Sequence, residues 1–380
     1  MTDLRQKLTD RRLDHKTDFD YDGLNRLTSS EADKTADSSR VDHYAYDYDK
    51  ASNMTHRTHN GSDTWFRHND NNELECSYAG AKDEGSDCPS GGRTYAYDDA
   101  GNLTGSSSGL QIGIDAKNHT ASVTPPGGEA LDMSYASESQ VERTKRGSTS
   151  FLQNALGLSL LSESETQTTA LTRDDRGAVQ GHRTDDNSER FYYLTDAIGS
   201  VVAVTDGQGA VRSRYEYDPF GQTKPQAEGR AFEDSAPAGR ALMRFQGQLL
   251  DRESGFYKMG HRYYAPTIAE ATGGGGGLLG GGSTGSSDQG VGNAAYDRWS
   301  QVDPLNQFQD PRQGNRYVYA ACDPVNLSDP TGEFSLTSAL TGCLFTGTEA
   351  FGLAPPTPQT RLGFFVGGCA IGFLSYGFAG

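Results

Sequence analysis

Few residues in this sequence have the types and spacing that metal or phosphate chemistry requires. Residues 18–23 carry aspartates at positions 18, 20 and 22 and a glycine at 23, as in the first half of an EF-hand calcium loop. Position 12 of that loop is Ser29, where calcium needs a bidentate glutamate. The glycine run at 273–280 lacks the Gly-Lys-Ser/Thr ending of a phosphate-binding loop. We therefore predict no metal ion and no cofactor.

The five cysteines indicate disulfide bonds more than catalysis. Cys76 and Cys88 flank a short polar loop, which a disulfide could close in an oxidising compartment. Two unpaired surface thiols are an equally good interpretation. Cys343 and Cys369 could likewise tie the C-terminal region, which would leave Cys322 single. No cysteine or histidine cluster has zinc spacing, and the eight histidines lie beside no hydrolase signature.

The composition predicts a polar protein that is rich in β-structure. Of 380 residues, 51 are Asp or Glu and 34 are Lys or Arg, which gives a net charge of −17. Hydrophobic residues make up only 34% of the chain, too few for a multi-span membrane protein. The basic clusters of a nucleic-acid-binding protein are missing, so we predict no nucleic-acid partner. The 19 Tyr and 16 Phe are too many for a disordered chain.

An imperfect repeat is the strongest signal in the sequence. Six Tyr-Asp dipeptides occur, and three of them begin one template: Tyr-Asp, a turn that contains Asn, an apolar residue and Thr. These copies start at Tyr21, Tyr48 and Tyr97, and weaker copies start at Asn69 and Asp175. A spacing of roughly 20 to 30 residues is typical of stacked supersecondary units.

Each copy of the repeat predicts a β-hairpin. Alternating stretches such as 43–48 and 214–217 suit half-buried strands that carry their aromatic residues on one face. Asp, Gly and Asn supply the turn, because they tolerate positive φ and bond their own backbone. One hairpin cannot bury its aromatic face alone, so neighbouring hairpins must stack into an extended sheet. The predicted fold class is therefore all-β.

These repeats resemble the YD-repeat family, and the later part of the chain resembles its RHS-repeat-associated core domain. Together the two resemblances cover most of residues 15–332. A glycine-rich insert at 273–293 and Ala265, where the family has Asp, are departures from the pattern. The similarity to the core rests on an ordered series of motifs: Phe191-Tyr192-Tyr193-Leu194-Thr195-Asp196, Tyr215-Glu216-Tyr217-Asp218-Pro219-Phe220-Gly221, Phe245-Gln246-Gly247, His261-Arg262-Tyr263-Tyr264, Val302-Asp303-Pro304, Asn315-Arg316-Tyr317 and Asp329-Pro330-Thr331-Gly332.

The resemblance implies a β-sheet that spirals into a shell around the C-terminal segment, which in this family is typically a variable toxin. The visible repeats are fewer than a complete shell needs, so the chain looks like the C-terminal piece of one. We expect a polar segment at 1–14, a YD-repeat hairpin array at 15–190 and an RHS-repeat-associated core at 191–332. A short apolar, glycine-rich tail, helical in one interpretation, follows at 333–380.

The resemblance also implies a self-cleavage site. Many family members cut themselves after the residue that follows Asp-Pro-x-Gly, here Glu333, with the help of aspartates inside the shell. Asp303 matches the first family aspartate, but its partner's position holds Gln313-Gly314, and Asp310 is nearby but out of register. Buried carboxyl groups could provide the necessary acid–base chemistry. The alternative, which we favour, makes Asp303 a turn residue before Pro304.

The leading hypothesis is a non-enzymatic shell segment that encloses its own C-terminal tail as cargo. Secretion or a cell-surface location follows from the resemblance, as does an immunity protein or a cell-surface partner; no signal peptide is readable. One alternative is a glycan- or protein-binding repeat protein, which outward-facing tyrosines would favour. Another is a membrane-active effector, because residues 362–378 lack charges and could contact a bilayer.

Overall fold

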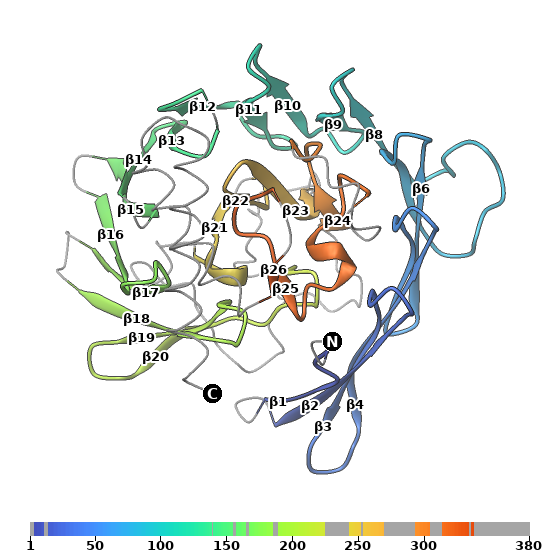
Figure 1. Cartoon of the computed structure of the whole chain (residues 1–380), viewed down its shortest axis with the longest axis horizontal. Coiled ribbons are helices and arrows are strands. Elements are labelled where there is room, and N and C mark those ends of the chain that lie inside the picture. Colours follow the sequence, from blue (N-terminus) through green and yellow to red (C-terminus); the bar gives the residue numbers. More distant parts are fainter. Residues whose placement is uncertain are drawn as a thin grey trace, which may run out of the picture.

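The computed structural model describes residues 4–337, apart from gaps at 11–13, 139, 155–156, 165–166, 185–188, 225–242, 252–253, 270–292, 305–313 and 334–335. These residues are almost wholly β-sheet, with two short 3-10 helices, η1 (Phe245–Gly247) and η2 (Ala320–Cys322). The all-β prediction is confirmed. A long curved sheet, called the wall below, surrounds the described residues of 243–337, called the plug (Figure 1).

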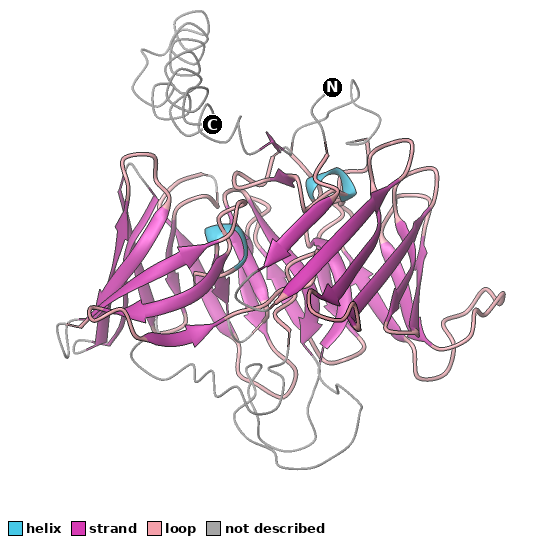
Figure 2. Ribbon diagram, turned by 90° about the horizontal axis from the view of Figure 1, so that it is seen from below, coloured by secondary structure: helices cyan, strands magenta, loops and turns pink. Residues whose placement is uncertain are grey.

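The wall is a twenty-stranded antiparallel meander in which each strand pairs with the next one in the sequence. Among the described strands β1 pairs only with β2 and β20 only with β19, so the sheet is open between its ends (Figure 1). The strands stand side by side with turns at both rims (Figure 2). Their bounds are β1 (Lys7–Asp10), β2 (His15–Tyr21), β3 (Leu27–Lys34), β4 (Arg40–Tyr48), β5 (Met54–His59), β6 (Ser62–His68), β7 (Leu74–Ala79), β8 (Arg93–Tyr97), β9 (Leu103–Ser106), β10 (Gln111–Ile114), β11 (Thr120–Thr124), β12 (Leu131–Tyr135), β13 (Arg143–Arg146), β14 (Thr149–Asn154), β15 (Gly157–Ser164), β16 (Gln167–Arg173), β17 (Val179–Thr184), β18 (Arg190–Thr195), β19 (Val201–Asp206) and β20 (Val211–Arg214).

One type of turn recurs along the wall and explains the aspartate of the repeat. In the turn at 49–53, Asp49 Oδ1 accepts hydrogen bonds from the amides of Ala51 (2.9 Å) and Asn53 (2.8 Å). The carboxylate thus takes the place of a backbone acceptor and holds the turn closed. An aspartate binds the amides two and four residues further on in the same way at Asp22, Asp98, Asp115, Asp174, Asp196 and Asp206.

The tyrosine before that aspartate connects one hairpin to the preceding one. Tyr48 Oη donates to the carbonyl of Leu27 (2.8 Å), and Tyr97 Oη accepts from the amide of Leu74 (3.3 Å). Both leucines are completely buried. Among the tyrosines that the structure describes, only Tyr192 is exposed. The aromatic side chains therefore fill the inside of the wall, as a half-buried strand requires.

A short segment after β20, residues 215–224, links the two ends of the wall and is called the strap below. The ring of Phe220 packs edge-on against Tyr46 of β4, with 5.1 Å between the ring centroids. Lys224 forms an ion pair with Asp42, also of β4. The open side of the wall is thus bridged by side-chain contacts rather than by strand pairing.

The plug contains a four-stranded antiparallel sheet and a two-stranded ladder. The four strands are β21 (Leu249–Asp251), β22 (Phe256–Met259), β23 (Arg262–Ala269) and β24 (Asn293–Trp299), and the ladder joins β25 (Leu327–Ser328) to β26 (Leu336–Thr337). All three apolar clusters of the described residues contain side chains of both wall and plug. The plug is therefore the surface against which the wall buries its aromatic face.

The plug and the wall divide the chain differently from the sequence motifs. Strands β18, β19 and β20 belong to the wall, although their residues lie in the predicted core domain at 191–332. The predicted domain limits thus stay predictions. No helix in the described part of the chain has the length and apolarity to cross a membrane. The predicted tail lies outside the described residues from position 338 onward.

Candidate functional site

The candidate site surrounds Arg262, the first residue of β23. Its guanidinium lies over the ring of Trp299, 4.0 Å from the ring centroid. Arg262 Nε donates to the carbonyl of Gly332 (2.5 Å), and Nη1 donates to the carbonyl of Arg316 (3.0 Å). The side chain is 3% exposed, so its N–H groups must bind protein acceptors. Arg262 therefore holds two distant chain segments against the plug sheet.

Two aspartates bind the same guanidinium. Arg262 Nη2 lies 2.8 Å from Asp303 Oδ2 and 3.1 Å from Asp329 Oδ2. Both aspartates are buried and both directly precede a proline. Contacts of this kind between charged groups are short and strong, and they position the carboxylates as acceptors. The arginine thus brings together two aspartates that are 26 residues apart in the sequence.

The Asp-Pro-Thr-Gly motif forms one more copy of the repeat's turn. Asp329 Oδ1 accepts from the amide of Glu333 (3.1 Å) and from the hydroxyl of Thr331 (3.2 Å). The amide of His261 donates to the carbonyl of Thr331 (2.7 Å). A Cβ atom on Gly260 would lie 2.0 Å from that carbonyl oxygen, so only glycine allows the approach. The turn is therefore docked tightly on the β22–β23 hairpin.

Glu333, the predicted cleavage position, is part of this cluster. Its Oε1 lies 3.1 Å from His261 Nε2. Burial raises the pKa of Glu333, with Arg262 as an opposing influence. Burial lowers the pKa of His261, and the nearby cations Lys258 and Arg262 add to the effect. Both shifts favour the neutral groups, and a neutral carboxyl can donate a proton.

The predicted site residues are only partly described by the structure. Asp303 lies in the cluster through its ion pair with Arg262, whereas Asp310 lies outside the described residues. The geometry holds the backbone before the predicted cut and places carboxyl and imidazole groups beside it. The catalytic role of Asp303 and the cleavage at Glu333 stay predictions.

The sequence pattern by itself indicated no role for Arg262 or His261. Both belong to a motif, His261-Arg262-Tyr263-Tyr264, that served only as a mark of resemblance. An arginine beside two tyrosines on a buried strand needs buried acceptors, because an unpaired charge is very unfavourable there. That requirement was the available signal, but it does not say which of the many aspartates the arginine binds.

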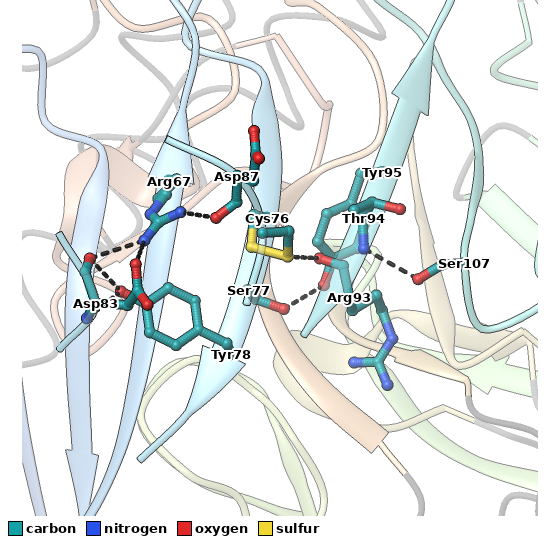
Figure 3. The surroundings of a disulfide bond; sticks show 11 residues. Arg67, Cys76, Ser77, Tyr78, Asp83, Asp87, Arg93, Thr94, Tyr95 and Ser107 are labelled. Atoms are coloured by element: carbon teal, nitrogen blue, oxygen red, sulfur yellow. Dashed lines mark hydrogen bonds and ion pairs between the residues drawn. A yellow bond between two sulfur atoms is a disulfide. The ribbon is translucent and has the colours of Figure 1, made fainter. Parts of the chain in front are cut away.

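A disulfide anchors the loop between β7 and β8 on the opposite side of the wall from the plug. Cys76 of β7 is bonded to Cys88, and Figure 3 shows the side chains around the bond. Arg67 Nη2 donates to the carbonyl (2.7 Å) and to the carboxylate (2.8 Å) of Asp83 in the same loop. Cys322 is buried with a free thiol, and Cys343 and Cys369 lie outside the described residues.

No group of three or more His, Cys, Asp or Glu in the described part of the chain could hold a metal ion. The calcium-like stretch at 18–23 begins inside β2, and its last aspartate closes the turn to β3. Asp22 Oδ1 accepts from the amides of Leu24 (2.9 Å) and Arg26 (3.0 Å). These aspartates therefore belong to the repeat's strand and turn.

Parts of the chain are similar to a protein family and to several known proteins. Residues 158–270 match the model of the Teneurin YD-shell family. The chain is 27% identical over 181 residues to the tRNA3(Ser)-specific nuclease WapA of Bacillus spizizenii, which covers 46% of this chain and 7% of that protein. It is 26% identical over 141 residues to the toxin protein Tse5 of Pseudomonas aeruginosa, with 37% and 8% covered. Salivary gland surface protein 1 of Aedes aegypti is 27% identical over 203 residues, with 50% and 5% covered.

The chain spans less than a tenth of the length of these relatives. Among solved structures, the chain is similar to the crystal structure of TcdB2-TccC3, with 17% identity and a TM-score of 0.39 over 84% of this chain and 19% of that chain. The family match agrees with the features described above: ordered Tyr-Asp turns, tyrosines that join successive hairpins and a single meandering sheet. These matches and the all-β fold support a YD/RHS shell protein.

Proposed function

We propose that the chain is the part of a secreted, toxin-type shell protein that encloses a C-terminal cargo and fixes the point where the cargo begins. The observation that carries the proposal is the docking of the 329–333 turn on the plug. Arg262 and the β22–β23 hairpin hold this turn, and the plug itself lies within the curve of the wall (Figure 1). Two relatives are named as a nuclease and a toxin, which supports a cargo of that kind.

Buried ion pairs explain how the plug would stay in place. Asp251 of β21 lies 2.5 Å from Arg143 Nη1 and 2.8 Å from Arg146 Nη1, and both arginines belong to β13 of the wall. Departure of the plug would leave these charges unpaired, which costs several kcal/mol for each pair. A cargo attached after Glu333 is therefore tethered to a body that the wall retains.

The proposed role needs no enzyme activity in the wall, and self-cleavage would be a separate step at Glu333. The Cys76–Cys88 bond suits the oxidising surroundings of a secreted or cell-surface protein. An immunity protein that recognises the cargo, or a cell-surface partner, would be the external partner under this proposal.

The alternative of a surface-binding repeat protein is less well supported. It needs exposed tyrosine platforms, yet among the described tyrosines only Tyr192 is exposed. The alternative of a membrane-active tail concerns residues 362–378, which lie outside the described residues. Deletion of residues 340–380 separates it from the shell: vesicle leakage that survives the deletion would exclude the tail as its cause.

Limited proteolysis of the intact chain, followed by mass spectrometry, tests the enclosing role. We expect peptides C-terminal to Glu333 to be cut as slowly as peptides from β22 and β23. The Asp251→Asn variant should accelerate both sets, because it weakens the contact between plug and wall. The exposed loop at 35–39 provides the internal reference for unprotected chain. C-terminal peptides that are cut as fast as this loop in the wild-type chain would refute the proposal.

A further inference from the structure

Three segments that are far apart in the sequence meet at one buried arginine. Arg57 of β5 lies 3.2 Å from Asp218 of the strap through Nη2 and 3.1 Å from Asp297 of β24 through Nη1. The arginine side chain is 8% exposed, and the two carboxylate groups are 1% and 2% exposed. The contact, called the junction below, therefore joins the first part of the wall, the strap that bridges its open side and the plug.

The charges of the junction do not balance. One guanidinium faces two carboxylates, so the three side chains carry a net charge of −1 when all are ionised. Asp297 Oδ1 is buried and binds no hydrogen-bond donor among the described residues. A buried charge without compensation is strongly unfavourable in a protein interior. Uptake of one proton would make the junction neutral.

The other polar groups around the junction do not supply a second positive charge to it. Tyr44 and Tyr46 approach from β4 and Tyr264 from β23, and burial raises the pKa of all three, which keeps them neutral. Gln222 of the strap contributes a neutral acceptor, 3.4 Å from Arg57 Nη2. Lys224 is the nearest cation on the strap, and it is paired with Asp42.

The cavity beside Asp297 adds His68 of β6 and Cys322 of η2, and also Arg298, the next residue along β24. Burial holds the pKa of His68 well below its usual value, and burial also raises the pKa of the Cys322 thiol, so both are neutral. Arg298 donates through Nη2 to the carbonyl of Asn72 (2.5 Å) and lies over the ring of Tyr317. No ion pair joins Arg298 to Asp297 in the described structure.

We propose that the junction is a proton-operated latch, in which protonated Asp297 lets Arg57 hold strap, wall and plug together and deprotonation loosens them. The proton supplies the missing positive charge. When Asp297 is neutral, the guanidinium of Arg57 faces a single carboxylate, that of Asp218. The ligand of this site is thus a hydrogen ion, and the junction loosens when the pH rises through neutrality.

The electrostatics agree with this geometry. Burial raises the pKa of Asp297 to about 7, against the opposing effect of Arg57 and with a further increase from Asp218. The folded-state pKa is higher than the value of about 4 in an unfolded chain. The proton therefore stabilises the folded junction fully below about pH 4, and this contribution is lost as the pH rises to about 7. Linkage gives an opening constant that grows about 30-fold between pH 5.5 and pH 8.

Hydrogen exchange of the intact chain at pH 5.5 and pH 8 tests the latch. Rates of strap peptides (215–224) are corrected for the intrinsic effect of pH on exchange and compared with those of Asp297→Asn, which has no proton to lose. We expect the protection of the wild-type strap to fall about 30-fold more than that of the variant. At pH 8 the variant strap should be better protected than the wild-type strap.

Asp251→Asn is the control, because Asp251 is equally buried but faces two arginines. It should lower protection at both pH values without a change in the pH dependence. Asp218→Asn is the second test of the latch and should also flatten the pH dependence. Equal pH dependence in the wild-type chain and in both junction variants would overturn the proposal. Strap exchange is independent of how fast peptides after Glu333 are cut, so failure of the latch and failure of the enclosing role are distinguishable.

Discussion

The contact between Asp251 and two wall arginines offers the sharpest test of how wall and plug are joined. Arg143 approaches both carboxylate oxygens of Asp251, at 2.5 and 2.7 Å, and Arg146 approaches one of them at 2.8 Å. Although burial alone would raise it, the two arginines hold the pKa of Asp251 below its usual value. The substitution Asp251→Asn therefore removes the one carboxylate that compensates two buried guanidinium groups in this contact.

Removal of one partner from a buried ion pair typically costs about 3–5 kcal/mol, and we expect a loss of that size in the free energy of unfolding. Urea denaturation is followed by tryptophan fluorescence, because Trp299 lies in the plug and Trp65 on wall strand β6. We expect the loss to appear at both tryptophans, since the plug is the surface on which the wall is buried.

Glu84→Gln is the matched control, because the Lys82–Glu84 pair is exposed. Exposed pairs contribute little to stability, because water screens their attraction. A change below about 1 kcal/mol for Asp251→Asn would contradict the reasoning, since the contact would then be dispensable for the union of wall and plug.

Three further predictions concern other parts of the chain. Cys88→Ser should lower stability by about 3 kcal/mol, as the chain-entropy model gives for a loop of this length, and a thermal melt under non-reducing conditions measures it. Gly260→Ala should lower the free energy of unfolding, measured by urea denaturation, more than Gly61→Ala does. Both glycines have positive φ, but only at Gly260 would the added Cβ meet a backbone oxygen. Equal losses of stability in the two variants would contradict the docking of the 329–333 turn. Intact mass spectrometry of freshly purified wild-type protein and of the Asp303→Asn variant tests self-cleavage. An uncut wild-type chain of 40.9 kDa would make Asp303 a structural residue. A cut near Glu333 that occurs in the wild type and not in the variant would make Asp303 part of the self-cleavage site.

The sequence predicted the hairpin array because its rules are local. The turn at 49–53 needs only Asp49 and the amides of Ala51 and Asn53, all within five residues. The alternation on β4 likewise showed that Tyr44 and Tyr46 share a buried face. Such hairpins can form wherever another part of the protein buries their aromatic face.

The identity of that apolar partner was not readable. Nothing in the local pattern distinguishes β20 of the wall from β21 of the plug, because both are short strands beside Tyr-rich segments. The division depends on where the chain turns inward, and this depends on the strap, whose Tyr-Asp-Pro-Phe-Gly motif is the repeat's own turn used for a different contact.

The sequence by itself therefore determined the class of fold, the turns and the placement of the strand tyrosines on one face, because each results from interactions between near neighbours in the chain. Only the tertiary structure decided which arginine meets which aspartate. The chain has 34 basic and 51 acidic residues, and Arg57, Arg143 and Arg262 select aspartates 41 to 240 positions away. Coulomb attraction depends on the distance between charges in space and not on their separation in the sequence. The packing of the wall around the plug therefore decides which arginine pairs with which aspartate.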